Sequence, residues 1–430
     1  MATGTTDAPG GTGAPGAATR IDARALHARV TPAGELGSIA GFRWGACAAG
    51  LKAGGKADLG LLVCDAPATA AAVATTNRVK AAPLVLMLER LAEDAPQAVL
   101  VNSGNANAAT GAAGRRAAKR TTKAVASALG IPARSVVPAS TGVIGVPLPE
   151  APIVQAAPEL VASLSPEGAG AFAEAIVTTD LGTKAAASTV GRGKRRYRMV
   201  GVAKGAGMIH PNLATTLAFV VTDAPVRKRF LRRALREASD ATFNRITVDG
   251  DTSTNDVILA LASGAGGGER LSGDDAGSKR FVRALREVLE ALALQVVADG
   301  EGAQHVARVR VEQAPSPEAA LAVARTVGTS NLVKTALHGC DPNWGRILAA
   351  AGRAGVPFDP EKAEVRIGDH VLYRRGEALM TPEVEAAASA VMQAPLYDLV
   401  VRLGAGRAKE YVWTCDLGHE YVRINADYRS

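Results

Sequence analysis

Short apolar runs recur along this chain and set the strongest limit on how it can fold. Two of them, 217–221 (LAFVV) and 257–262 (VILALA), have only five and six residues. Runs of this length cannot cross a bilayer, but they suit buried β-strands. Further strands are predicted at 59–63, 98–101, 246–248 and 306–311.

Stretches with helical spacing lie between these runs. Helices are predicted at 115–129, 280–297 and 166–175, the last with Ser165 as its cap and Pro166 at its first position. The Asp-Gly-Asp sequence at 249–251 indicates a turn between two strands. Helices and strands alternate without the regular rhythm of a doubly wound sheet, so we expect a layered α/β sandwich.

The length of 430 residues allows one large or two ordinary domains. Residues 1–20 are mostly Gly, Pro, Ala and Thr, which predicts a disordered tail. No basic start leads into an apolar stretch with a cleavage site, so a cytosolic protein is expected. The four cysteines lie far apart in sequence, which favours buried free thiols over a disulfide framework or a metal site.

The net charge of +8 raises the question of nucleic-acid binding. Basic residues cluster at 193–198, which reads as a hairpin turn, and at 227–236. In the second cluster the apolar residues have helical spacing, so the arginines form the outer face of an amphipathic helix. No nucleic-acid module accompanies either cluster, and we expect no nucleic-acid partner. A positive field can instead attract small anionic substrates.

Familiar catalytic motifs are absent from the sequence or incomplete in it. Residues 50–56 (GLKAGGK) approach a phosphate-binding loop, but Ala57 stands where a magnesium-binding hydroxyl is needed. The six histidines are scattered, and no Gly-x-Ser-x-Gly or His-Glu-x-x-His sequence occurs. These absences direct attention to nucleophiles that carry their own base.

The segment 204–223 (KGAGMIHPNLATTLAFVVTD) holds such a candidate. Thr215 follows the small residue Ala214 and directly precedes an apolar strand. If its hydroxyl attacks the Ala214 carbonyl, hydrolysis of the resulting ester leaves a chain that begins with Thr215. The new α-amine, with an ordinary pKa of roughly 7.7–8.0, is a base suited to neutral pH. The alternative is that Ala-Thr-Thr simply starts a strand.

Two other segments are rich in small polar residues. In PASTGVIG (138–145), Thr141 and Gly142 can offer a hydroxyl and a backbone N–H to a developing oxyanion. The alternative is an ordinary turn after a strand. The stretch NSGNANAATG (102–111) suits a turn or a loop that faces a ligand.

Taken together, these segments resemble the ornithine acetyltransferase family, in order and across almost the whole chain. The other matching motifs are TTNRVKAAP (75–83), AIVTTD (175–180), AKGAGMIHPNLAT (203–215), TFNRITVDGDTSTND (242–256), DGEGA (299–303), LVKTALHGCDPNWGRI (332–347) and YVRINADY (421–428). The resemblance implies an α/β sandwich and an enzyme of arginine biosynthesis.

The resemblance also implies a processed chain. Cleavage between Ala214 and Thr215 would give an α chain, 21–214 after the tail, and a β chain, 215–430, associated as a heterotetramer of two of each. Thr215 would carry an acetyl group from N-acetylornithine to glutamate. No cofactor or metal is implied, although acetyl-CoA serves some members as a second donor.

By the same resemblance, Thr141 and Gly142 match the oxyanion-hole pair. The substrate-binding positions match Thr178, Lys204, Thr215, Glu301, Asn425 and Ser430. The chain departs from the family pattern at Gln304-His305, where Thr-Lys is usual, and at Thr216, where Met or Leu is frequent. His210, close to the cleavage site, is interpreted as structural rather than catalytic.

Two other functions stay open on these residues. A self-processing aminopeptidase or amidohydrolase would use the same N-terminal threonine, with water as the final acceptor. A binding or regulatory protein would keep the fold without catalysis. Acetyl transfer that depends on glutamate would separate the enzyme from both.

Overall fold

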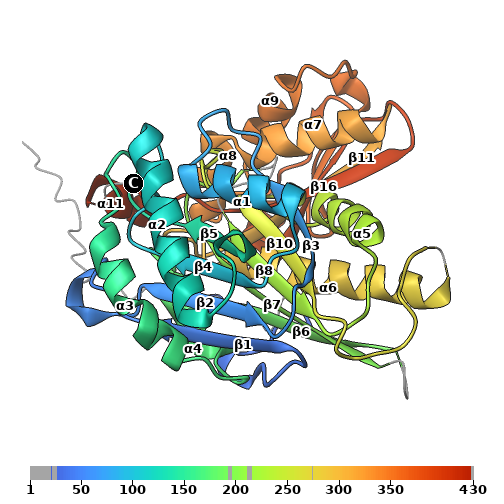
Figure 1. Ribbon diagram of the computed structural model, residues 1–430. Helices are drawn as coiled ribbons and strands as arrows, with labels where there is room; N and C mark the ends of the chain where they lie inside the picture. The colour runs from blue at the N-terminus through green and yellow to red at the C-terminus, as the bar shows by residue number, and fades with distance from the viewer. Residues whose placement is uncertain (1–20, 22–26, 192–195, 211–215, 274, 428–430) are drawn as a thin grey trace, which may run out of the picture.

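The computed structural model describes residues 21, 27–191, 196–210, 216–273 and 275–427. In this part of the chain three sheets form, and helices cover them (Figure 1). Ala214, Thr215, Ser430 and the first half of the basic turn at 193–198 lie outside the described residues. No helix within the described ranges is both long and apolar enough to span a membrane.

The first sheet has the order β1-β2-β4-β5, and its strands are β1 Phe42–Cys47, β2 Leu59–Cys64, β4 Ala98–Asn102 and β5 Val136–Ser140. The second has the order β3-β10-β8-β7-β6, with β3 Thr69–Ala74, β10 Val257–Ala262, β8 Leu217–Thr222, β7 Tyr197–Lys204 and β6 Lys184–Val190. Within them, β4–β5 and β8–β10 are parallel pairs. The other pairs are antiparallel.

The third sheet has the order β14-β13-β12-β15-β11-β16-β9. Its strands are β14 Glu377–Ala378, β13 His370–Arg374, β12 Glu364–Ile367, β15 Leu396–Arg402, β11 Val306–Ala314, β16 Ala408–Cys415 and β9 Ile246–Thr247. This sheet has its own apolar core against helices α7 to α10.

The α-helices lie between and around the sheets. They are α1 Ala82–Glu93, α2 Gly111–Leu129, α3 Glu150–Ala162, α4 Ala169–Ile176, α5 Lys228–Asp240, α6 Ala276–Ala298, α7 Pro317–Gly328, α8 Asn331–His338, α9 Trp344–Gly352, α10 Pro382–Met392 and α11 His419–Asp427. Short 3-10 helices occur at Ala33–Glu35, Ala53–Gly55, Ala133–Ser135, Phe243–Arg245 and Pro360–Lys362.

The first two sheets face each other and give the layered arrangement that the sequence predicts. One apolar core joins their inner faces and includes Trp44, Phe172 and Phe219. A second core packs α2 and α3 on the outer face of the first sheet, and a third packs α5 and α6 on the outer face of the second. Strand β8 lies between β10 and β7 and is buried throughout, which explains its uninterrupted apolar sequence.

Most of the predicted elements are confirmed, with small shifts at their ends. The predicted strands at 59–63, 98–101 and 306–311 correspond to β2, β4 and β11, and the helices at 115–129 and 280–297 to α2 and α6. The basic segment at 227–236 lies in α5, which buries Phe230, Leu231, Ala234 and Leu235 as expected. Cys47, Cys64 and Cys415 are buried free thiols, whereas Cys340 is partly exposed.

One local prediction is wrong, and one predicted turn joins strands whose pairing the sequence did not specify. The helix expected from Pro166 begins at Ala169, because Ser165 exchanges backbone hydrogen bonds of 2.8 and 2.9 Å with Trp44 and is held extended beside β1. The strands on either side of Asp-Gly-Asp do not form a hairpin. Strand β9 pairs with β16 and β10 with β8, so this turn connects two different sheets.

Candidate active site

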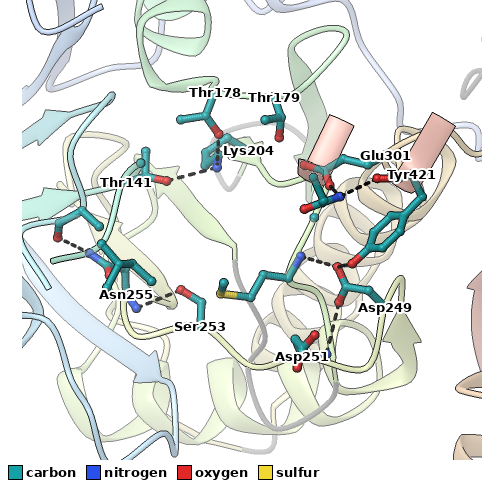
Figure 2. Close-up of a pocket in the computed structure, with 16 residues that line it drawn as sticks. Thr141, Thr178, Thr179, Lys204, Asp249, Asp251, Ser253, Asn255, Glu301 and Tyr421 are labelled. Carbon is teal, nitrogen blue, oxygen red and sulfur yellow. Dashed lines mark hydrogen bonds between the residues drawn. The ribbon is translucent and has the colours of Figure 1, made fainter. Parts of the chain in front are cut away.

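A cavity of about 180 Å³ is lined by side chains from segments that lie far apart in the sequence (Figure 2). Six of the residues predicted from the sequence line it: Thr141, Gly142, Thr178, Lys204, Glu301 and Asn425. They lie after β5, after α4, at the end of β7, after α6 and on α11. The convergence of residues so distant in sequence makes this cavity the candidate active site.

Strand β8, which follows the predicted cleavage point, begins beside Lys204, a residue that lines the cavity. Leu217, the first residue of β8, pairs with Lys204 of β7 on one side and with Val257 of β10 on the other. The Val257 N–H donates to the Thr216 carbonyl at 3.1 Å. Thr216 itself is buried, and its hydroxyl finds no partner among the described residues. Thr215, the residue before Thr216, lies outside the described residues.

Gly142 occupies a position that only glycine can take. Its φ is +129°, and a Cβ atom there would lie 2.3 Å from the Gly104 carbonyl carbon. The N–H groups on either side, of Thr141 and Val143, donate to Asn102 and Gly104 carbonyls. The Gly142 N–H has no acceptor in the described part of the chain, and Gly142 lines the cavity. It is therefore available to a ligand oxygen.

The stretch 102–111 supports this turn instead of facing a ligand with its polar side chains. Asn102 accepts from the Ser140 hydroxyl at 2.5 Å and donates to the Asn105 carbonyl at 2.8 Å. Asn255 donates to the Ser140 and Ala106 carbonyls, each at 2.8 Å. These buried amides fix the segment that carries Thr141.

Lys204 and its neighbours form the charged part of the site. Its ammonium donates to Thr141 Oγ1 at 3.1 Å and to Thr178 Oγ1 at 2.8 Å. Burial lowers its pKa, and nearby acids offset this only in part. Burial would raise the pKa of Asp180, but Lys184 and Lys204 outweigh it and hold this pKa well below its usual range. Asp180 is therefore ionised at neutral pH.

The opposite wall of the cavity carries carboxylates. Glu301 accepts from the Asn425 amide at 2.7 Å, and the Tyr421 hydroxyl donates to Asp249 at 3.4 Å. Asp249 also accepts from the backbone N–H groups of Met208 and Ile209, the latter at 2.9 Å. Burial raises the pKa of Asp249 to about 6. Asp251, which is exposed, completes this acidic wall.

Sequence reasoning gave no role to six polar residues that line the cavity: Thr179, Asp249, Asp251, Ser253, Asn255 and Tyr421. Four of them lie in the connection between β9 and β10, where carboxylates and small polar residues are dense. This density of polar residues can indicate a ligand site, but the sequence analysis interpreted it as a turn.

Local contacts bear on two further expectations, for the loop at 50–56 and for His210. In and beside the loop at 50–56, three backbone N–H groups that could bind a phosphate are already used. Those of Leu51 and Lys52 donate to the buried Asp58 carboxylate at 2.5 and 3.1 Å, and that of Ala49 donates at 2.6 Å. An anion would be repelled there, which agrees with the rejection of a nucleotide site. His210 contacts the Thr247 hydroxyl at 3.3 Å and does not line the cavity.

Comparison with known proteins assigns the family. The model of the ArgJ family matches residues 43–430. The arginine biosynthesis bifunctional protein ArgJ of Geobacter sulfurreducens is 46% identical over 393 residues, covering 91% of this chain and 100% of the relative. That of Symbiobacterium thermophilum is 46% identical over 400 residues, with 93% and 99% covered.

A solved structure, the ornithine acetyltransferase of Mycobacterium tuberculosis complexed with ornithine, is 37% identical. The match covers 43% of this chain and 97% of that one, with a TM-score of 0.39. The family match and the two relatives cover nine-tenths of this chain or more. The chain therefore belongs to the ArgJ family, and its predicted place among the acetyltransferases of arginine biosynthesis is confirmed.

Proposed function

We propose that this protein moves the acetyl group of N-acetylornithine to glutamate through an acetyl ester on Thr215, giving ornithine and N-acetylglutamate. The observation that carries the proposal is the division of the cavity into two walls. Thr141, with Gly142 next to it in sequence, lies on one side and can donate from its hydroxyl, and the carboxylates of Glu301 and Asp249 lie on the other (Figure 2). An acyl oxygen fits the first wall and a cationic amino acid fits the second.

The acidic wall favours a diamino acid as the acetyl donor. Asp249, Asp251 and Glu301 border the cavity. An ammonium group of ornithine near them gains charge-assisted hydrogen bonds, and Asn425 holds the Glu301 carboxylate for that contact. Thr178 and Ser430 complete the proposed substrate-binding set. A neutral acyl compound would gain nothing from these carboxylates.

The nucleophile forms by self-cleavage in this proposal. The Thr215 hydroxyl attacks the Ala214 carbonyl, and the amide becomes an ester as the Thr215 nitrogen takes up a proton. Water then hydrolyses the ester and releases the carboxylate of Ala214. The free α-amine of Thr215 can now accept the proton of its own hydroxyl, with an ordinary pKa of roughly 7.7–8.0.

Acetyl transfer follows in two balanced steps. The Thr215 oxygen attacks the acetyl carbonyl, the oxyanion is stabilised by Thr141 and Gly142, and ornithine leaves with the proton. The amine of glutamate then attacks the acetyl ester, and the proton it loses returns to the Thr215 oxygen as N-acetylglutamate leaves. Acetyl-CoA as a second donor would load the same oxygen with loss of the thiol. No cofactor takes part.

The two pieces, α ending at Ala214 and β starting at Thr215, would stay together. Strands from both lie next to each other in the second sheet, β7 beside β8 and β3 beside β10. Separation would break these ladders and the core around them. We propose two copies of each piece in a heterotetramer, located in the cytoplasm.

Intact mass and an acetyl-transfer assay test the proposal. Purified protein should give two fragments, one beginning at Thr215, and should form N-acetylglutamate only when glutamate is added. Thr215→Ala should give one intact, inactive chain. Release of acetate that is indifferent to glutamate would identify a hydrolase instead. Uncleaved wild-type protein without turnover would identify a binding protein. Replacing N-acetylornithine by acetyl-CoA tests the second donor.

A further inference from the structure

The Asp249 carboxylate joins three segments that are far apart in the sequence. It accepts hydrogen bonds from the backbone N–H groups of Met208 and Ile209, the latter at 2.9 Å. It also accepts from the Asp251 N–H at 3.2 Å and from the Tyr421 hydroxyl at 3.4 Å, and Figure 2 shows both residues beside it. A carboxylate offers about four acceptor positions. The protein itself uses all of them, so Asp249 presents its charge to the cavity and not a free acceptor.

Met208 has a backbone conformation that this carboxylate stabilises. Its φ is +58°, in the left-handed region that residues other than glycine rarely adopt. In such a turn successive N–H groups point to the same side and form a concave site for an anion. Asp249 fills that site, and burial raises its pKa to about 6, which leaves it ionised at neutral pH. The strained turn is thus matched to a negative charge that the fold supplies.

The segment 206–209 is fixed on both sides of this turn. The Glu301 N–H donates to the Ala206 carbonyl at 3.0 Å. The Val248 N–H donates to the Ile209 carbonyl at 2.8 Å. The carboxylate of Asp249 therefore acts on a short piece of backbone whose ends are already held.

This segment leads to the predicted cleavage point. Ile209 lies five residues before Ala214. Beyond the cut, Thr216 is held by the Val257 N–H, which donates to its carbonyl at 3.1 Å. Attack of a hydroxyl on the neighbouring carbonyl requires a narrow range of orientations, and fixing the chain on both sides of the bond favours that range. The bonds to Asp249 are part of the fixation on the side before the cut.

We infer that Asp249 is a positioning residue for self-cleavage, because its carboxylate holds Met208 in the left-handed turn that precedes the Ala214–Thr215 bond. This role rests on the proposed function, since it concerns the step that forms the nucleophile. Asp249 would act through the backbone that it holds and not by contact with the reacting atoms.

The rate of self-cleavage during cell-free synthesis tests the inference, with the uncut chain and the two fragments distinguished by mass. Each oxygen of Asp249 accepts from a backbone N–H, so in Asp249→Asn the amide nitrogen faces a donor in either orientation. We expect cleavage to slow about tenfold or more, since a misplaced segment loses the orientation needed for attack.

Asp58→Asn is the matched control. The Asp58 carboxylate also accepts from three backbone N–H groups, one on one oxygen and two on the other, but Asp58 does not line the cavity. Its replacement removes the same kind of contact elsewhere in the fold. We expect the cleavage rate of this variant to stay within about threefold of the wild-type rate.

Changes at Met208 separate positioning from a general loss of stability. Glycine adopts the left-handed conformation readily, so Met208→Gly should raise the cleavage rate of Asp249→Asn at least about threefold. Met208→Val keeps the carboxylate, but a side chain branched at Cβ disfavours the turn, and cleavage should slow about tenfold. Met208→Leu, which is not branched at Cβ, should cleave within about threefold of the wild-type rate.

Thermal unfolding in the Thr215→Ala background shows which variants fold. Three results overturn the inference: a folded Asp249→Asn that cleaves at the wild-type rate, equal slowing by Asp58→Asn, or no rescue by Met208→Gly. If Asp249→Asn does not fold, the other two Met208 variants decide, and equal rates in Met208→Val and Met208→Leu overturn it. A wild-type chain that stays uncut overturns the proposed function itself, whereas failure of the inference alone leaves the wild type cut.

Discussion

The side-chain amide of Asn425 donates to the carboxylate of Glu301 at 2.7 Å, across 124 residues of sequence. This bond ties α11 to the loop after α6. Gly302 lets the helix approach, since a Cβ there would lie 2.8 Å from the Tyr421 nitrogen. On its other side the Glu301 carboxylate lies against Gly207, where a Cβ would come within 2.5 Å. The position of the carboxylate is therefore set from both sides.

Asn425→Leu should weaken the binding of the amino-acid substrate. The replacement removes the donor but keeps a side chain of similar size, so the Glu301 carboxylate loses its orientation. A hydrogen bond to a charged group is worth about 1.5–3 kcal/mol, so KM for N-acetylornithine should rise about 10- to 100-fold. Val422→Ala on the same helix is the control, because Val422 is 65% exposed. An unchanged KM in Asn425→Leu would rule out this role for the contact.

Asp249 should make stability depend on pH. Burial raises its pKa from 3.8 to about 6 in the folded protein. Between about pH 4 and 6 the folded state therefore holds a proton that the unfolded state has released, and the free energy of unfolding falls as the pH rises through this window. The contribution is about 3 kcal/mol below pH 4 and is lost above pH 6.

Thermal unfolding of wild type and Asp249→Asn between pH 4.5 and 7.5 measures this effect. The variant does not titrate, so the difference between the two Tm values should shift in favour of the wild type as the pH falls, and be constant above about pH 6.5. Asp369→Asn, at an exposed position between β12 and β13, controls for charge removal. Parallel curves for wild type and Asp249→Asn would contradict the prediction.

The central strands could be predicted because burial on both faces requires continuous apolar runs, as in β8 and β10. Pairing partners could not be predicted, since a run of apolar residues does not specify which strand lies beside it. Strand β9, two residues long, is defined by its neighbour β16 and not by its own sequence. Helix α4 begins later than predicted because the backbone of Ser165 hydrogen-bonds to that of Trp44, a residue far away in sequence.

The candidate site also contains some residues that could be predicted from the sequence and some that could not. Thr141, Gly142, Thr178, Lys204, Glu301 and Asn425 were found through motifs, and the fold brings them to one cavity. Asp249 and Tyr421 were missed because their roles depend on a contact between the turn before β10 and α11. The buried partners of Lys204 escaped for a related reason. Asp180 and Lys184 are close in sequence, but Asp299 joins them only in the folded protein.

Gly142→Ala should abolish most of the acetyl transfer. The added Cβ would meet the Gly104 carbonyl carbon at 2.3 Å, and φ of +129° is strained for alanine, so the N–H at this position must shift. Loss of one oxyanion donor costs about 100- to 1000-fold in kcat. Gly145→Ala is the matched control in the same loop. Its φ is +82°, but nothing lies within 4 Å of the added Cβ. Retention of more than a tenth of wild-type kcat in Gly142→Ala would exclude the proposed donor.

Lys184→Met should destabilise the protein strongly, because it leaves Asp180 and Asp299 buried without their shared cation. Lys184 is 1% exposed and lies 2.6 and 2.5 Å from these carboxylates, which together raise its pKa although burial opposes them. Breaking a buried ion pair from one side costs about 3–5 kcal/mol.

The surface pair Arg43–Asp65, with side chains 42% and 58% exposed, provides the comparison. Arg43→Ala should cost less than about 1 kcal/mol, since water already screens that pair. Urea unfolding of both variants at pH 7 measures the contrast. Lowering the pH toward 3 should narrow the gap for Lys184→Met, because protonation relieves the orphaned carboxylates. Equal losses in the two variants would mean that the buried cluster contributes no more than a surface contact.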